Sequence, residues 1–192
     1  MPDLVAVLEG VAVIAGFAYV WFNIRQNIWT WPAAIFSSAL FGVVFFDSSL
    51  YATMTLQGLF ITIAIYGWKK WLTGGRDGGV LRVSRLSLRL GLILLAVTVL
   101  IALLLASVLA TYTDSQYPQW DAITTALSVT ASWMVARKIL ENWLVWIVTD
   151  IVYVGLYMAS GLYLTTLLYA AYLILAAIGY VTWRRSYRTN VI

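Results

Sequence analysis

Cysteine and histidine are both absent from the 192-residue sequence. Without cysteine the chain has no disulfide, no thiolate nucleophile and no sulfur ligand for zinc. Without histidine it also lacks the usual general base at neutral pH and the commonest metal ligand. We therefore expect neither an enzyme nor a bound cofactor or metal.

Charged residues are scarce as well. They make up only 10% of the chain, against roughly 25% in a soluble domain, whereas 62% of the residues are hydrophobic. The net charge of +4 comes from short basic clusters between apolar runs, so we expect no nucleic-acid partner. A chain of this composition needs the lipid bilayer as its second solvent.

Apolar runs of spanning length follow one another along the whole chain. About 20 apolar residues cross the roughly 30 Å of a hydrocarbon core. Runs of this kind lie at residues 4–22, 28–46, 50–72, 87–111, 120–138, 141–158 and 161–183. The first run has no basic segment before it and no small-residue cleavage site, so it is interpreted as a retained span. The sequence predicts an all-α, multi-pass membrane protein with seven transmembrane helices.

The basic residues predict the orientation. Lys and Arg in short loops are retained on the cytoplasmic side of a membrane. All twelve lie around the loops that follow the first, third, fifth and seventh runs. We therefore expect the N-terminus outside and the C-terminus inside.

An internal repeat is visible in the sequence. Four residues recur, two at a spacing of 115 and two at a spacing of 112: Asn27 with Asn142, Trp31 with Trp146, Gly67 with Gly179, and Trp71 with Trp183. We interpret them as two parallel three-helix repeats joined by a linker helix, a three-plus-one-plus-three arrangement known from transporters. The expected parts are residues 1–72, 73–119 and 120–192.

The sixth run carries a carboxylate near its middle. Asp150 lies about nine residues, or roughly 13 Å, into this helix, where a lone charge is costly. Five residues spaced by 3, 4, 3 and 4 share one helix face: Trp143, Trp146, Asp150, Tyr153 and Tyr157. Such a face suits a flat aromatic cation. The alternative is that the tryptophans belong to an interfacial belt and Asp150 bonds to a neighbouring helix.

Four more polar residues complete the candidate substrate-binding set: Glu9, Asn27, Gln57 and Asn142. Glu9 and Gln57 would either complete a polar site or pair between helices. Ser and Thr residues within the helices, including Thr124 and Ser128, are interpreted as packing residues. The remaining Trp and Tyr residues at helix ends are interpreted as interface anchors.

The segment Glu141–Asp150 reads ENWLVWIVTD. Its Trp143, Trp146 and Asp150 fit the W-x-x-W-x-x-x-N/D substrate motif of the PnuC family of vitamin transporters, which the chain resembles over nearly its whole length. The resemblance implies a homotrimeric protein of the bacterial inner membrane that facilitates diffusion of an unphosphorylated vitamin, which a cytoplasmic kinase then traps.

The cargo follows less directly from the resemblance. Asp150, in place of Asn, favours thiamine, the branch often called PnuT. Nicotinamide riboside is the alternative, because it is also an aromatic cation, but its ribose hydroxyls would require more amide partners than the candidate set offers. Riboflavin defines a third branch. A vitamin-binding subunit of an ATP-driven importer is less favoured, because the internal repeat argues against it.

Overall fold

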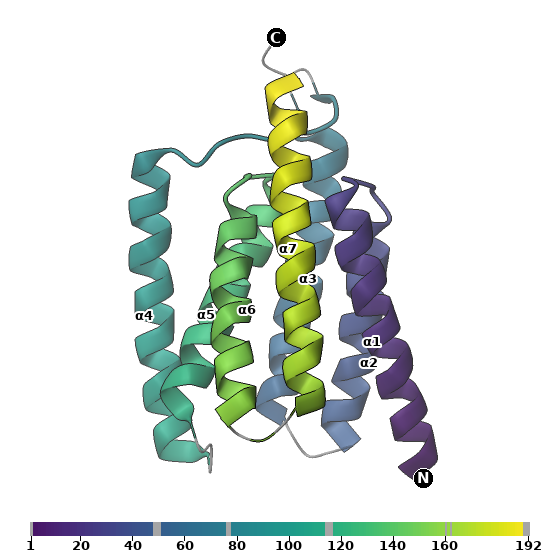
Figure 1. The fold of residues 1–192 in the computed structure, drawn as a ribbon, viewed down its shortest axis with the longest axis vertical. Helices are drawn as coiled ribbons and strands as arrows, with labels where there is room; N and C mark the ends of the chain where they lie inside the picture. The colour runs from purple at the N-terminus through teal and green to yellow at the C-terminus, as the bar shows by residue number, and fades with distance from the viewer. Residues whose placement is uncertain are drawn as a thin grey trace. The chain divides into compact units, whose positions relative to one another are not determined.

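The computed structural model describes residues 2–47, 51–75, 78–113, 117–159, 161 and 163–189. Seven α-helices account for most of these residues (Figure 1). They are α1 (Pro2–Ile24), α2 (Thr30–Asp47), α3 (Tyr51–Thr73), α4 (Leu88–Tyr112), α5 (Pro118–Ala136), α6 (Asn142–Ala159) and α7 (Tyr163–Thr189). The all-α fold with seven helices is thereby confirmed.

The helix bounds follow the apolar runs closely, with one exception. α7 continues to Thr189, six residues beyond the expected end at residue 183. The added turns contain Arg184, Arg185 and Arg188. Arginine is a good helix former, and a cation near a helix C-terminus is favourable for the helix dipole. The apolar run therefore ends before the helix does.

The chain forms two compact units. One unit consists of Met1–Arg82 together with Ala136–Lys138, and the other of Val83–Val135 together with Ile139–Ile192. The first unit thus contains α1, α2 and α3, and the second contains α4 to α7.

The helices of the two units share one register. The end of α1, both ends of α2 and the start of α3 lie 112 residues before the corresponding points of α5, α6 and α7. Even the positive φ angles recur, at Gln26 (53°) and Lys138 (49°). The spacing of 115 expected for Asn27 and Trp31 is therefore wrong, because Asn27 lies in the turn before α2 whereas Asn142 is the first residue of α6.

In this register Trp31 corresponds to Trp143, and each ring packs in the same way. Trp31 lies edge-on to Trp71, with ring centroids 5.2 Å apart at 85°. Trp143 lies edge-on to Trp183 at 5.6 Å and 87°. Gly67 and Gly179 make room for the two indoles, because a Cβ on either glycine would overlap the ring. The α2–α3 and α6–α7 pairs are therefore packed by the same contact, a tryptophan indole set against a glycine and a second tryptophan. The sequence also repeats Leu50 at Leu162, again at a spacing of 112, but both residues lie outside the part of the chain that the structure describes.

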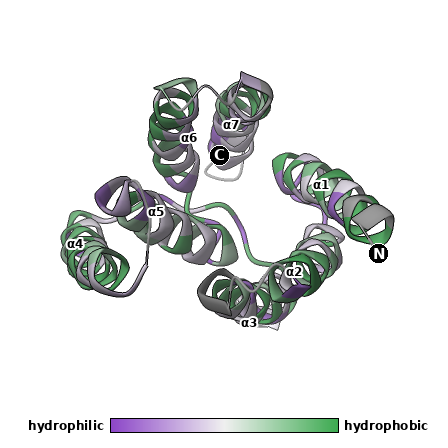
Figure 2. Ribbon diagram, turned by 90° about the horizontal axis from the view of Figure 1, so that it is seen from below, coloured by the Kyte–Doolittle hydropathy of each residue, from purple (hydrophilic) through white to green (hydrophobic). Residues whose placement is uncertain are grey.

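Polar contacts fix the remaining helices within each unit. In the first unit, the Ser37 hydroxyl donates to the Ala12 carbonyl oxygen at 2.8 Å and joins α2 to α1. In the second, the hydroxyls of Thr98 and Thr130 are 2.6 Å apart and join α4 to α5, which lie side by side in Figures 1 and 2. Hydroxyls packed between helices are an ordinary means of helix association in membranes.

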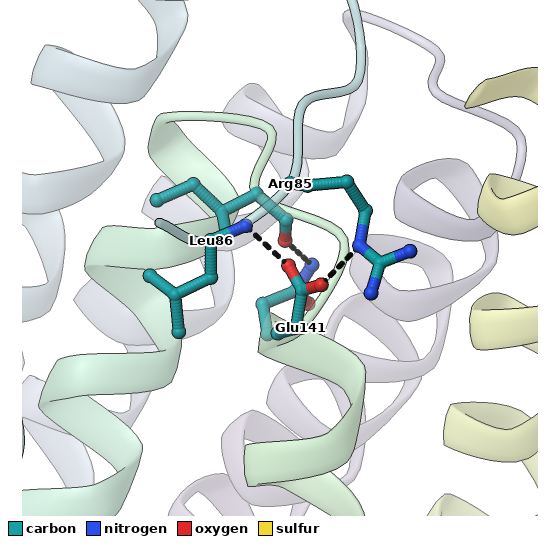
Figure 3. Close-up of polar contacts among 5 residues, drawn as sticks. Arg85, Leu86 and Glu141 are labelled. Carbon is teal, nitrogen blue, oxygen red and sulfur yellow. Dashed lines mark hydrogen bonds and ion pairs between the residues drawn. The ribbon is translucent and has the colours of Figure 1, made fainter. Parts of the chain in front are cut away.

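The entry to α4 is held by a carboxylate at the start of α6 (Figure 3). Glu141 accepts a hydrogen bond from the Leu86 backbone N–H at 2.8 Å and another from the Arg85 guanidinium. The bond and the charge of Glu141 raise the pKa of Arg85 above its ordinary value. Ser87 then caps α4 by accepting from the Leu90 N–H. The polar segment before α4 is thereby tied to the second unit.

The connection between α5 and α6 contributes two cations to the first unit. Arg137 donates a hydrogen bond to the Tyr66 hydroxyl at 3.2 Å. The Lys138 ammonium lies 4.2 Å from the centroid of the Trp71 ring. Burial lowers the pKa of Lys138 to about 8. This connection lies beyond the ends of the helices and outside their apolar segments.

Five helices are long and apolar enough to cross a membrane: α1, α2, α4, α6 and α7. α3 and α5 do not meet that standard in the described residues, although both were expected to span. α5 instead buries a row of small residues that includes Ala122, Ala126 and Ala131. A helix enclosed by protein need not be apolar on every side. Figure 2 shows the contrast between apolar α4 and more polar α5.

Candidate functional site

α6 presents one aromatic face with a carboxylate at its centre. The helix is continuous from Asn142 to Ala159, so the five residues spaced by 3, 4, 3 and 4 do share a side. Asp150 is only 4% exposed. A carboxylate buried at mid-helix is costly unless polar groups surround it, so its neighbours indicate the position of a site.

Four tyrosines from α6 and α7 gather beside Asp150, and we call them the tyrosine cluster: Tyr153, Tyr157, Tyr169 and Tyr172. The rings of Tyr153 and Tyr157 stack at 5.7 Å, and Tyr169 lies 4.3 Å from the first and 5.2 Å from the second. Tyr172 meets Tyr169 edge-on at 6.0 Å. The cluster joins the inner faces of two neighbouring helices.

The hydroxyls of the cluster form a polar network. Tyr153 is hydrogen-bonded to the side chains of Thr124 and Ser128 on α5, and Tyr157 to Tyr169. Asp150 lies close enough to Tyr153, Tyr169 and Tyr172 to interact with them electrostatically. Thr124 and Ser128, which the sequence suggested as packing residues, therefore connect α5 to the network.

The two tryptophans of the motif have different surroundings. Trp143 is 2% exposed and is enclosed by Gly179 and Trp183. Trp146 is half-buried one turn further along α6, on the same face as Asp150. Asn142, also fully buried, donates its side-chain amide to the Ile139 carbonyl oxygen at 2.6 Å. Trp146 has more ring surface left for a ligand than Trp143.

Three candidate residues lie in the first unit. Glu9 is on α1 and exposed. Gln57 is half-buried on α3, where its Cβ lies 4.0 Å from a Cβ built on Gly42 of α2. Asn27 lies in the turn before α2, and its carboxamide oxygen accepts from the Trp29 N–H at 3.0 Å. Asn27 therefore stabilises a turn.

Sequence reasoning missed Tyr169 and Tyr172. Both lie on α7, three residues apart, whereas only Trp and Tyr residues at helix ends were interpreted as interface anchors. The spacing of 112, which the sequence already showed for Gly67 and Trp71, aligns Tyr169 with the candidate residue Gln57 and Tyr172 with Phe60. Among the described residues, no three Asp or Glu side chains are grouped closely enough to hold a metal ion.

Known proteins resemble this chain over most of its length. The family model for the nicotinamide mononucleotide transporter matches residues 6–185. The nicotinamide riboside transporter PnuC of Escherichia coli (strain K12) is 29% identical, and the alignment covers 94% of this chain and 86% of that protein. The riboflavin/roseoflavin transporter RibM of Streptomyces davaonensis is 31% identical over 79% of this chain and 72% of its own length.

A solved structure shares the fold. The crystal structure of the vitamin B3 transporter PnuC superposes with a TM-score of 0.75 at 23% sequence identity, covering 96% of this chain and 83% of that one. At this identity the likeness concerns the arrangement of the helices.

Proposed function

Because the chain belongs to the nicotinamide mononucleotide transporter family, we propose that it carries nicotinamide riboside across the inner membrane. The family consists of vitamin transporters of the PnuC type rather than enzymes, and this chain is a multi-pass inner-membrane transporter. One observation supports an aromatic cation as the substrate: Asp150 is buried in α6, between Trp146 and the tyrosine cluster.

Trp146 stacks on the pyridinium ring of the substrate in this proposal. A tryptophan face attracts a flat cation, and the attraction increases where water is excluded. Asp150 balances the fixed positive charge, and Tyr153 contributes a hydroxyl beside it. Trp143 supports the site from behind, since its ring packs against Gly179 and Trp183.

Nicotinamide riboside replaces thiamine as the first choice of cargo. The relatives described above are named for nicotinamide riboside, riboflavin and vitamin B3, which supports the alternative more than the thiamine branch. Asp150 in place of Asn suits either cation. It adds a negative charge and does not exclude a ribose. Thiamine is therefore tested as a competing cargo.

The finer architecture belongs to the same proposal. Two parallel three-helix repeats, α1–α3 and α5–α7, are joined by α4, with the N-terminus outside and the C-terminus inside. Helix bounds repeated at 112 residues and basic loops on alternate ends support this arrangement. Alternating access arises from motion of one repeat against the other. In the same proposal the protein is a homotrimer, and a cytoplasmic kinase traps the transported vitamin. Glu9 and Gln57 remain candidate polar contacts.

Binding to the purified protein tests the proposed cargo. Nicotinamide riboside should quench the fluorescence of the tryptophans saturably, whereas thiamine and riboflavin should bind more weakly. Asp150→Ala should lower the riboside affinity by roughly tenfold or more, because the bound cation loses its counter-charge. The yield of folded protein should change much less.

Two results would contradict the proposal. Saturable binding of thiamine alone would move the chain to the other branch of the family. Equal loss of folded protein and of binding in Asp150→Ala would assign a structural role to Asp150.

A further inference from the structure

The two repeats differ in chemistry at the tyrosine cluster. At a spacing of 112, Tyr153 and Tyr157 correspond to Phe41 and Phe45, and Tyr172 corresponds to Phe60. Asp150 corresponds to Ser38. The second repeat therefore carries hydroxyls and a carboxylate where the first carries mainly phenyl rings.

The hydroxyls are not needed for packing. Phe41 and Phe45 stack with ring centroids 5.8 Å apart at 15°, and Tyr153 and Tyr157 stack at 5.7 Å and 13°. Two rings four residues apart on one helix therefore reach the same geometry with phenylalanine on α2 as with tyrosine on α6.

A hydroxyl removed from water costs free energy unless it is hydrogen-bonded, and the bonds to Thr124, Ser128 and Tyr169 offset that cost. Because a tyrosine hydroxyl can both donate and accept, these bonds leave hydrogen-bonding capacity for a ligand.

The positions of the hydroxyls point to a ligand rich in hydroxyl groups. A tyrosine O–H can donate and accept, while a carboxylate accepts only. Three tyrosines of the cluster lie within electrostatic reach of Asp150, and the rings are half-buried rather than fully enclosed. A vicinal diol offers two donors and two acceptors, which matches such a mixed set.

We propose that the tyrosine cluster, with Asp150, binds the ribosyl hydroxyls of the substrate. The inference rests on the proposed function and deepens it: Trp146 holds the aromatic cation and the α6–α7 tyrosines select for the sugar. It supplies the hydroxyl partners that the sequence alone did not reveal. Tyr169 and Tyr172 are then specificity-determining residues of the second repeat.

Two ligands that differ by the sugar test this assignment. Nicotinamide riboside and 1-methylnicotinamide share the cationic ring, but only the riboside carries hydroxyls. We expect Tyr169→Phe and Tyr172→Phe each to weaken binding of the riboside by roughly tenfold, as for lost hydrogen bonds in a desolvated site. Binding of 1-methylnicotinamide should change by less than about twofold, because its ring contacts are unaltered.

Tyr163→Phe is the matched control on the same helix. Tyr163 is 72% exposed at the start of α7, so removing its hydroxyl should leave both affinities unchanged. The midpoint of thermal unfolding of each variant reports on folding. 1-Methylnicotinamide could bind the wild type too weakly to measure. In that case the riboside affinities of Tyr163→Phe and of the two cluster variants are compared, and weaker binding in the cluster variants alone supports the assignment.

Three outcomes overturn the inference. Equal weakening of both ligands would mean that the hydroxyls shape the site for the ring, and unchanged riboside affinity in Tyr169→Phe and Tyr172→Phe would mean that they do not meet the sugar. In both cases the proposed function survives if the wild type binds the riboside. Failure of the wild type to bind it would overturn both.

Discussion

Lys138 combines burial, an unusual backbone angle and a positive charge. It is 4% exposed, has a φ of 49°, and places its ammonium over the Trp71 ring. Gln26, which lies 112 residues earlier, also has a positive φ, of 53°, but carries no charge. Burial disfavours the charged form of a lysine, and lowers the pKa of Lys138 to about 8. The aromatic face offsets part of this cost.

The stability of the protein should therefore depend on pH through Lys138. The pKa of Lys138 is about 8 in the folded protein and about 10.4 in the unfolded chain, the value for an exposed lysine. Between these two pH values the unfolded chain binds more protons than the folded protein. Raising the pH through this window favours the folded state, and below about pH 8 both states keep the proton. We expect the thermal midpoint of the wild type to rise relative to Lys138→Gln between about pH 7 and about pH 9.5.

Lys138→Gln is the matched variant because it restores the residue type of Gln26 at the same φ. The comparison cancels other groups that titrate in this range. A difference in midpoint that stays constant with pH would show that Lys138 keeps an ordinary pKa.

At the same scale, the site could be predicted in part. Trp146, Asp150 and Tyr153 follow from helical periodicity alone, because residues three and four apart share a face. Tyr169 and Tyr172 required knowledge of how α7 meets α6, which no single run contains. The roles of Trp143 and Asn142 also depend on neighbours, since Gly179 and Ile139 determine what they contact.

At the scale of helices, two glycines determine how α2 packs on α3 and α6 on α7. Each glycine leaves a space, here called a notch, that a tryptophan ring of the other helix occupies. The Trp31 indole of α2 occupies the space beside Gly67 of α3, and the Trp143 indole of α6 does the same at Gly179 of α7. Small residues allow helices to approach closely in a membrane. Here the approach admits a large ring from the partner helix.

Gly67→Ala should destabilise the protein by about 1–3 kcal/mol, because the new methyl group overlaps the Trp31 ring and that ring is buried. The thermal midpoint in detergent measures the loss. Gly58→Ala, on the same helix but with no atom within 4 Å of its Cβ, is the control. It should be neutral or stabilise by up to about 1 kcal/mol. Equal midpoints for the two variants would contradict this account of the notch.

Helix positions could be predicted well from the sequence because hydropathy reports directly on spanning segments. The register of the repeat was harder. A match of Asn and Trp at the start of two helices indicated a spacing of 115, but the helix ends and the tryptophan–glycine pairs require 112. Identical residues at the starts of two helices can recur by chance. A tryptophan–glycine contact that forms in both helix pairs is stronger evidence for the spacing.

At the scale of the whole molecule, the two proposed repeats combine a matching frame of helices with different chemistry at the candidate site. The frame consists of matching helices and matching tryptophan–glycine contacts in the two repeats. The carboxylate and the tyrosine cluster are found in the second repeat only. The matching contacts recur at a spacing of 112, and Asp150 and the tyrosine cluster are positions at which the two sets of helices differ in chemistry.

Uptake into liposomes that contain only the purified protein tests the central claim most directly. With labelled nicotinamide riboside outside, and with neither ATP nor an ion gradient, the account predicts uptake until the concentrations equalise. Unlabelled riboside loaded inside should accelerate entry of the label by exchange. Uptake no faster than in protein-free liposomes, or uptake of thiamine but not of the riboside, would contradict it.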